Sequence, residues 1–376
     1  MIIYMNNMKL NLEQQLLISA CRITFDSKDE IKSILDSNSI NWGLVIQYAC
    51  KNKVLGLLHN CFLDKTIRDK MPKYFLSLLD DFCSCIYLRN EEKFSELENI
   101  CDEMSNCNIK FVVVKGGYLI DNVYRNRKIR ATNDIDALIR REDIKEIDKI
   151  MRRNGYKQGE YDPEDNLIIE SNRDLKMLYK LKMYNLLPYI KINNDIPKRT
   201  VIFDLSHALD FTLDALPVGE MLALSIPGNK SLELLPAHFF VHLCCHHYRE
   251  ASNVAWILIG KDLNLIKFCD VREFVLRKMD SNSIQAAIQF AKKYRLEKAL
   301  YFTIYFTREI YNDGYETEIL KALDIDDESF LYQFGEKDYN ELQTRKKDFW
   351  TSLFSDNNRD EITAAPKYEN LIEGDV

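Results

Sequence analysis

Apolar residues in the first third of the chain recur at the spacing of helix faces. The clearest run has the i, i+3, i+4, i+7 pattern and consists of Trp42, Val45, Ile46 and Ala49. Asn41 stands directly before it, where an amide side chain can accept a hydrogen bond from a free first-turn N–H group. A long helix is expected from about Pro72 to Asn106. The pattern predicts a helical N-terminal domain over residues 1–106.

The pattern changes at Ile109, where short β-branched runs begin to alternate with helical stretches. Strands are expected at Phe111–Val114, Asp134–Ile139 and Thr200–Leu205, with weaker candidates at Leu167–Glu170 and Leu175–Lys180. Helices are expected over Tyr118–Arg127 and Arg141–Asn154, with Gly155 as the cap of the second. Strands and helices thus mix between about Ile109 and Phe211, and we expect the chemistry in this part of the chain.

Helical spacing returns after Leu232. Helices are expected over Pro236–Arg249, Leu263–Met279, Ser283–Tyr294 and Leu296–Tyr311. From about Asp356 the sequence is polar and acidic, and such an end is expected to fray. The predicted fold is α+β, with a small mixed β-sheet core flanked by N- and C-terminal helical regions. The expected domains are residues 1–106 (helical), 107–215 (α/β core), 216–355 (helical) and 356–376 (polar tail).

Composition narrows the class of protein. The 376 residues include only 12 glycines and 8 prolines, which favours helices over tight hairpins. With 58 acidic and 51 basic residues the formal net charge is −7, so a broad basic surface for long DNA or RNA is not expected. The start, MIIYMNNMKLNLEQQ, shows no secretory signal, and no apolar run is long enough to span a bilayer. We expect a cytoplasmic protein with no membrane partner.

The cysteines argue against a disulfide framework. Ten are scattered along the chain, and none of them forms a CxxC motif. Zinc ribbons and thioredoxin-like proteins both need that motif. Free thiols in a reducing compartment are therefore expected.

Asp134 and Asp136 alternate along a predicted strand, so both carboxylates point to the same face. Adjacent carboxylates raise each other's pKa unless a cation lies between them. Mg²⁺ takes oxygen ligands and commonly bridges carboxylates to substrate phosphates. Two such ions about 4 Å apart stabilise the attacking and leaving oxygens in nucleotidyl or phosphoryl transfer. The pair predicts a metal site, although a solvated edge strand can carry the same residues.

The residues Lys115-Gly116-Gly117 end an apolar strand and begin a predicted helix. Glycines there let backbone N–H groups approach phosphate oxygens, and the positive end of a helix dipole favours the same charge. Lys115 is suited to pair with a phosphate. A plain strand-to-helix turn with a solvated lysine has the same residues, so the turn alone leaves both interpretations open.

The order apolar strand, Lys-Gly-Gly, helix, arginine, Asp-Ile-Asp resembles the DNA polymerase β-type nucleotidyltransferase superfamily. The stretch VVVKGGYLIDNVYRNRKIRATNDIDALI is similar to a bacterial branch described as nucleotidyltransferase family proteins. VIFDLSHAL resembles the strand that delivers the third metal carboxylate there, and LLPAHFFVHLCCHHYREA with LIKFCDV resembles its C-terminal helical region. The likeness runs in patches from the N-terminal helices to about Phe274.

The resemblance implies a metal centre. Asp134, Asp136 and Asp204 would be the catalytic residues that hold two Mg²⁺ ions, with Mn²⁺ as an alternative metal. Asp204 would also assist deprotonation of the acceptor hydroxyl. Two positions depart from the family's pattern. Tyr118 stands where many relatives have a serine, and His207 is displaced by one residue. The role of His207 stays open.

The resemblance also implies a nucleotide site. Gly116 and Gly117 would cradle the triphosphate of a nucleoside triphosphate (NTP). Lys115 and Arg130 would offset its charge, Arg130 through its bidentate fork. His246, on a predicted helix, is a further candidate for contact with the nucleotide or the acceptor.

Four histidines lie on that predicted helix, namely His238, His242, His246 and His247. The first three recur every four residues, so they lie on one helix face. Two histidines spaced in this way can bind zinc when a third ligand arrives from elsewhere. The surrounding phenylalanines also fit a packed helix with histidines at its rim. No metalloprotease spacing with a glutamate accompanies them.

Three functions are compatible with these residues. The first is transfer of a nucleoside monophosphate from an NTP to a hydroxyl of a small molecule, a peptide or protein, or an RNA end, with release of pyrophosphate. The second is a kinase-like phosphoryl transfer on the same scaffold. The third is a non-catalytic protein that binds nucleotide or a partner. The negative charge favours a small-molecule or protein acceptor over long nucleic acid.

Overall fold

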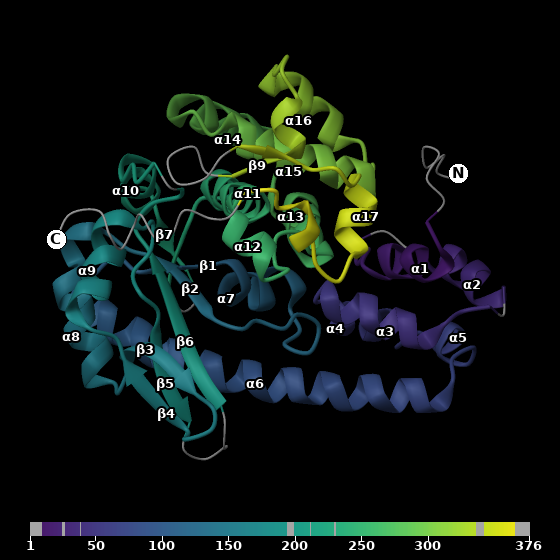
Figure 1. The fold of residues 1–376 in the computed structure, drawn as a ribbon, viewed down its shortest axis with the longest axis horizontal. Coiled ribbons are helices and arrows are strands. Elements are labelled where there is room, and N and C mark those ends of the chain that lie inside the picture. Colours follow the sequence, from purple (N-terminus) through teal and green to yellow (C-terminus); the bar gives the residue numbers. More distant parts are fainter. Residues whose placement is uncertain are drawn as a thin grey trace. The chain divides into compact units, whose positions relative to one another are not determined.

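The computed structural model of the chain describes residues 10–24, 27–37, 39–193, 199–210, 212–228, 231–335 and 342–364 (Figure 1). Residues group into two compact units. The helical unit comprises the described parts of Met1–Cys83, His247–Glu273 and Tyr301–Val376, and the sheet unit comprises those of Ser84–His246 and Phe274–Leu300. The unit boundaries fall inside four helices, which are α6 (Lys73–Asn106), α11 (Pro236–Ser252), α13 (Leu265–Lys278) and α15 (Glu297–Ile310).

The helical unit consists mainly of short helices. Those that lie wholly within it are α1 (Leu12–Ala20), α2 (Lys28–Asp36), α3 (Trp42–Lys51), α4 (Leu55–Cys61), α5 (Lys65–Arg68), α12 (Val254–Leu258), α16 (Tyr315–Leu323) and α17 (Phe349–Phe354). A small antiparallel pair, β9 (Gln333–Phe334) and β10 (Gln343–Thr344), accompanies them. The predicted cap of α3 is confirmed, because the Asn41 side chain accepts a hydrogen bond from the Leu44 amide at 3.1 Å.

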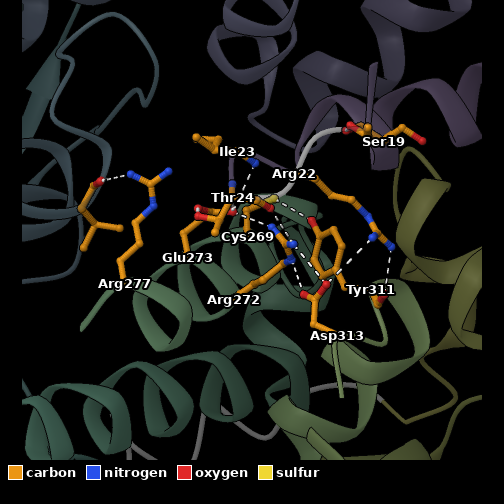
Figure 2. A network of polar contacts seen from close by, with 12 residues as sticks. Ser19, Arg22, Ile23, Thr24, Cys269, Arg272, Glu273, Arg277, Tyr311 and Asp313 are labelled. Atoms are coloured by element: carbon orange, nitrogen blue, oxygen red, sulfur yellow. Dashed lines mark hydrogen bonds and ion pairs between the residues drawn. The ribbon is translucent and has the colours of Figure 1, made fainter. Parts of the chain in front are cut away.

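A buried polar network holds the loop after α1 in the helical unit (Figure 2). The Glu273 carboxylate accepts hydrogen bonds from the amides of Ile23 and Thr24, each at 3.2 Å. Arg272, which has no exposed surface, donates to Glu273 at 2.6 Å and forms an ion pair with Asp313. Its guanidinium also donates to the Thr24 carbonyl at 2.9 Å. Each buried charge in this network therefore has an oppositely charged partner.

The sheet unit contains an eight-stranded mixed sheet within its described residues, in the order β4-β3-β5-β6-β2-β1-β8-β7. The strands are β1 (Val112–Val114), β2 (Ile135–Leu138), β3 (Lys157–Asp162), β4 (Leu167–Glu170), β5 (Tyr189–Asn193), β6 (Arg199–Ser206), β7 (Ile226–Pro227) and β8 (Leu232–Glu233). Its helices are α7 (Lys115–Leu119), α8 (Ile144–Arg153), α9 (Arg173–Lys182), α10 (Leu216–Ala223) and α14 (Ser281–Tyr294), with a π-helix at Ile120–Tyr124 and a 3-10 turn at Arg141–Asp143. The predicted α+β class is confirmed.

Helices α6 and α8 cover one face of this sheet. Their apolar residues, including Leu97 and Ile147, form one core with Ile135, Phe203 and Leu205 of the central strands. Neighbouring strand residues point to opposite faces of a sheet. Asp136, which follows Ile135, and Asp204, which lies between Phe203 and Leu205, are therefore on the other face. The core thus fixes which face of the sheet carries the acidic side chains.

Several local predictions are corrected by the structure. Leu175–Lys180 was expected as a weak strand but belongs to helix α9, because Asn172 caps the helix by accepting from the Leu175 amide at 2.8 Å. Strands β3 and β5 were not predicted. Residues 358–361 do not fray, since Asn358 and Glu361 are buried and 359–361 form a 3-10 turn. Phe211 and residues 365–376 of the predicted tail lie outside the described residues.

Other predictions are confirmed. The ten cysteines are free thiols. Gly155 follows α8 with a φ of +85°, a left-handed conformation that favours glycine. None of the described helices combines the length and apolar character needed to cross a membrane. The domain boundaries at residues 106, 215 and 355 stay a prediction.

Candidate active site

Three aspartates converge on the face of the sheet opposite the α6–α8 core. Asp136 on β2 stands directly beside Asp204 on β6 in the parallel register of these strands. Asp134 precedes β2 by one residue and lies on the same side as Asp136. One carboxylate oxygen from each of the three lies within 4.8 Å of the others. Strand alternation and strand pairing therefore build a compact acidic cluster.

A lysine from the first strand-to-helix turn neutralises part of this cluster. Strand β1 pairs with β2 so that Val114 opposes Asp136. The next residue, Lys115, has a φ of +49°, and its ammonium donates to the Asp136 Oδ1 atom at 2.6 Å. Left-handed backbone at a non-glycine residue is strained, so the surrounding structure holds Lys115 in this position.

The buried member of the cluster is the hardest to ionise. Asp136 has only 5% of its surface exposed, while Asp134 and Asp204 are half-buried. Burial raises the pKa of Asp136, Lys115 opposes this shift and the charges of Asp134 and Asp204 add to it, so that the pKa reaches about 8. Without a cation beyond Lys115, the cluster therefore retains a proton near neutral pH.

The raised pKa of Asp136 predicts how the stability of the metal-free protein depends on pH. Between about pH 4 and pH 8 the folded chain keeps a proton at Asp136 that the unfolded chain has lost, so the free energy of unfolding falls as pH rises. We expect the free energy of unfolding of the chelator-treated protein to fall in this way as pH rises, and we expect no such fall in Asp136→Asn. Urea unfolding of both proteins at several pH values measures the difference. Equal slopes for the two proteins would contradict the burial effect at this carboxyl.

The two glycines of the turn are required by close packing. A Cβ atom at Gly116 would collide with the Arg130 guanidinium and the Thr132 hydroxyl, and one at Gly117 would lie 2.6 Å from a Val113 methyl. Thr132 in turn donates to the Asp134 carbonyl at 2.9 Å. The loop that carries Arg130 is also fixed to α6, because Asn90 donates to the Arg130 carbonyl at 2.9 Å. The turn, Arg130 and Asp134 are thus packed as one assembly.

Gly116→Ala is expected to disturb that assembly. The added methyl must displace Arg130 and Thr132, and overpacking of this kind typically costs about 1–3 kcal/mol. Thermal or urea unfolding measures the loss. Gly219→Ala in α10 is the matched control, because its Cβ meets nothing within 4 Å and alanine favours helix. If both variants were equally stable, the close packing at Gly116 would not constrain the turn.

The arrangement of β1, the glycine turn and the acidic cluster agrees with a comparison to known families. A family model described as an uncharacterised nucleotidyltransferase matches residues 38–312, which is most of the chain. The chain belongs to this family. No curated protein matches it. The resemblance drawn from the residues around Asp134 is therefore confirmed at the level of the family.

The donor set of this family member fits a hard divalent cation. All three ligand candidates are carboxylates, which suit Mg²⁺ or Mn²⁺ rather than softer metals. Burial and, to a lesser extent, repulsion between the carboxylates raise the pKa of Asp136, and a cation bound between them would relieve that repulsion. Asp134, Asp136 and Asp204 are therefore the residues that would hold the metal in this family member.

Two neighbours of the cluster were not found from the sequence. The Asn185 amide donates to Asp204 Oδ1 at 2.8 Å, and Asn185 is buried. Tyr179 on α9 has its pKa raised by burial and by the charge of Asp204. Both lie on the segment whose strand and helix content was predicted poorly. A proline at position 188, next to a strand, was the available signal of irregular pairing there.

His207 has a structural partner. Its buried Nδ1 atom accepts a hydrogen bond from Arg141 Nε at 3.1 Å. Burial, with the nearby Arg141 charge, lowers the pKa of His207 to about 4, so the ring stays neutral at physiological pH. The residue thus holds Arg141 at the end of β2.

Within the part of the chain that the structure describes, the histidines of α11 do not form a metal centre. Among the described residues, the three aspartates are the group whose ligand atoms come close enough for an ion. His238 packs on Phe290 at a ring-centroid distance of 4.7 Å, and His247 packs on Phe268 at 4.3 Å. Burial lowers the pKa of both rings. His246 is half-buried on α11, and its contact with a nucleotide stays a prediction.

Proposed function

We propose that the chain is a metal-dependent nucleotidyltransferase that transfers a nucleoside monophosphate from an NTP to a hydroxyl and releases pyrophosphate. The observation that carries the proposal is the convergence of Asp134, Asp136 and Asp204 on one face of adjacent strands. Membership of a nucleotidyltransferase family supports the same chemistry. Proposed acceptors are a small molecule, a peptide or protein, or an RNA end.

In this proposal the three aspartates are the catalytic residues and metal ligands. Two bound Mg²⁺ ions, or Mn²⁺ in their place, would activate the acceptor hydroxyl and offset charge on the departing pyrophosphate. Asp204 would accept the proton of the acceptor hydroxyl. Its half-buried position leaves it more accessible than Asp136.

The proposed nucleotide site lies beside the glycine turn. Lys115 pairs with Asp136 in this structure, so it would turn from that carboxylate to the triphosphate when a cation takes its place. Gly116 and Gly117 would offer backbone N–H groups to phosphate oxygens, and Arg130, packed against Gly116, would offset phosphate charge. His246 would contact the nucleotide or the acceptor.

The test uses labelled nucleotides. The purified protein is incubated with Mg²⁺, cell extract and each NTP labelled at the α-phosphate, and mass spectrometry then locates the labelled acceptor. A parallel reaction with γ-labelled NTP separates the two transfer chemistries. Label from the α-position on an acceptor, with pyrophosphate as the second product, supports the proposal. Label from the γ-position with a nucleoside diphosphate would instead show a kinase-like enzyme, and transfer of neither label would favour a binding protein.

A further inference from the structure

The segment that pairs with the end of β6 contains an extra residue. Tyr189 opposes Phe203, but Asn185 opposes Ser206, so four residue steps on one strand face three on the other. Two hydrogen bonds define the shifted register, from the Leu186 amide to the Leu205 carbonyl at 2.8 Å and from the His207 amide to the Tyr184 carbonyl at 2.9 Å. The mismatch is a β-bulge between Asn185 and Tyr189.

The bulge changes the face to which Asn185 points. In the unshifted register Pro188 would oppose Asp204, and Asn185 would oppose His207 on the opposite face. Proline has no N–H to donate to the ladder, so regular pairing is interrupted there. The one-residue shift pairs Asn185 with Ser206, which shares the face of Asp204. The Asn185 amide then reaches Asp204 Oδ1 at 2.8 Å.

Asn185 is poorly explained as a residue of the core. Only 6% of its surface is exposed, and its Oδ1 atom has no hydrogen-bond partner among the described residues. A buried acceptor without a partner costs free energy that an apolar side chain of similar size would not. The stability of the fold alone therefore does not account for an asparagine at this position, whereas its bond to Asp204 does.

We propose that Asn185 is a positioning residue that orients the Asp204 carboxylate for metal binding. The amide donates to one carboxylate oxygen, and this hydrogen bond restricts the rotation of the Asp204 side chain. This inference rests on the proposed function, since it needs Asp204 to be a metal ligand. Hydrogen bonds from outer residues to metal-binding carboxylates commonly change metal affinity by about 10–100-fold.

The experiment measures Mn²⁺ binding to the full chain by electron paramagnetic resonance of the free ion. We expect Asn185→Leu to weaken binding by about tenfold while its thermal unfolding midpoint stays equal or rises. Asp204→Asn should weaken binding as well. In the double variant, loss of Asn185 should have no further effect, because its contribution acts through Asp204.

Gln158→Leu is the matched control. Gln158 is a buried amide that donates to the Leu187 carbonyl within the bulged segment, at 2.8 Å. It opposes Tyr189, which opposes Phe203, so it lies on the face of the sheet opposite Asp204. If Gln158→Leu weakens Mn²⁺ binding as much as Asn185→Leu does, general loosening of the bulge is responsible and the proposal is overturned. Additive effects of Asn185→Leu and Asp204→Asn would overturn it too.

The two proposals fail in different ways. If the unchanged protein binds no Mn²⁺, both the metal-dependent function and the role of Asn185 are wrong. If the protein binds Mn²⁺ through its aspartates and Asn185→Leu binds it equally well, only the role of Asn185 is wrong.

Discussion

Asp136→Asn is expected to lower nucleotidyl transfer by about a thousandfold or more. The substitution removes the buried carboxylate of the cluster, which lies directly opposite Asp204 in the register of β2 and β6 and two residues after Asp134. Metal ions and preorganised charges supply several kcal/mol of transition-state stabilisation in such sites, and each 1.4 kcal/mol is about tenfold in rate. The loss of activity is measured as transfer of label from the α-phosphate of the NTP to the acceptor in the cell extract.

The fold should survive this change. Asparagine has nearly the same shape, and it removes the cost of a buried carboxylate whose pKa is raised by burial. The thermal unfolding midpoint in chelator should therefore stay equal or rise. Asp102→Asn, which alters an exposed carboxylate on α6, is the control and should keep full activity. Activity in Asp136→Asn close to that of the unchanged protein would contradict the catalytic role of the cluster.

Arg272→Met is expected to destabilise the helical unit by about 3–5 kcal/mol. Arg272 has no exposed surface and is paired with both Glu273 and Asp313 (Figure 2). Removing one partner of a buried ion pair leaves uncompensated charge in a medium of low dielectric constant. Urea unfolding followed by circular dichroism measures the loss of free energy.

Lys28→Met provides the comparison within the same unit. Lys28 pairs with Asp64 at 3.0 Å, but 48% of its side chain is exposed. Exposed ion pairs contribute little because water and salt screen them. A small change in Lys28→Met beside a large one in Arg272→Met would assign the effect to burial. Similar changes in the two variants would show that Arg272 stabilises the fold no more than a surface residue does.

Patterns that are local in the sequence were predicted well. The alternation of Asp134 and Asp136 and the β-branched runs around Val113 and Ile202 identify strands, because alternation and β-branched side chains are both local signals of a strand. Asn41 was identified as a cap from its own first turn. These features depend on neighbours within a few residues, so the sequence contains the information needed.

Features that depend on pairing between distant segments were not predictable. Strand β3, with the sequence KQGEYD, lacks the apolar alternation of a strand and is defined by its partners β4 and β5. Helix α9 is rich in lysine, leucine and methionine, which favour a helix. The spacing of apolar residues over Leu175–Lys180 also fits a short strand, and the segment was therefore predicted as one. The bulge at Asn185 exists only relative to β6, because register is a property of two strands. The contact between Asn185 and Asp204 therefore could not be derived from either segment alone.

The parallel pairing of β2 with β6 has a consequence for synthesis on the ribosome. Asp134 and Asp136 emerge with β2, but their neighbour Asp204 follows only after α8, β3, β4, α9 and β5 have been made. Until then a nascent chain has two of the three carboxylates, with Lys115 as the nearby counter-charge. Ion capture is therefore expected to be a late event, one that reports completion of the sheet and does not guide its early steps.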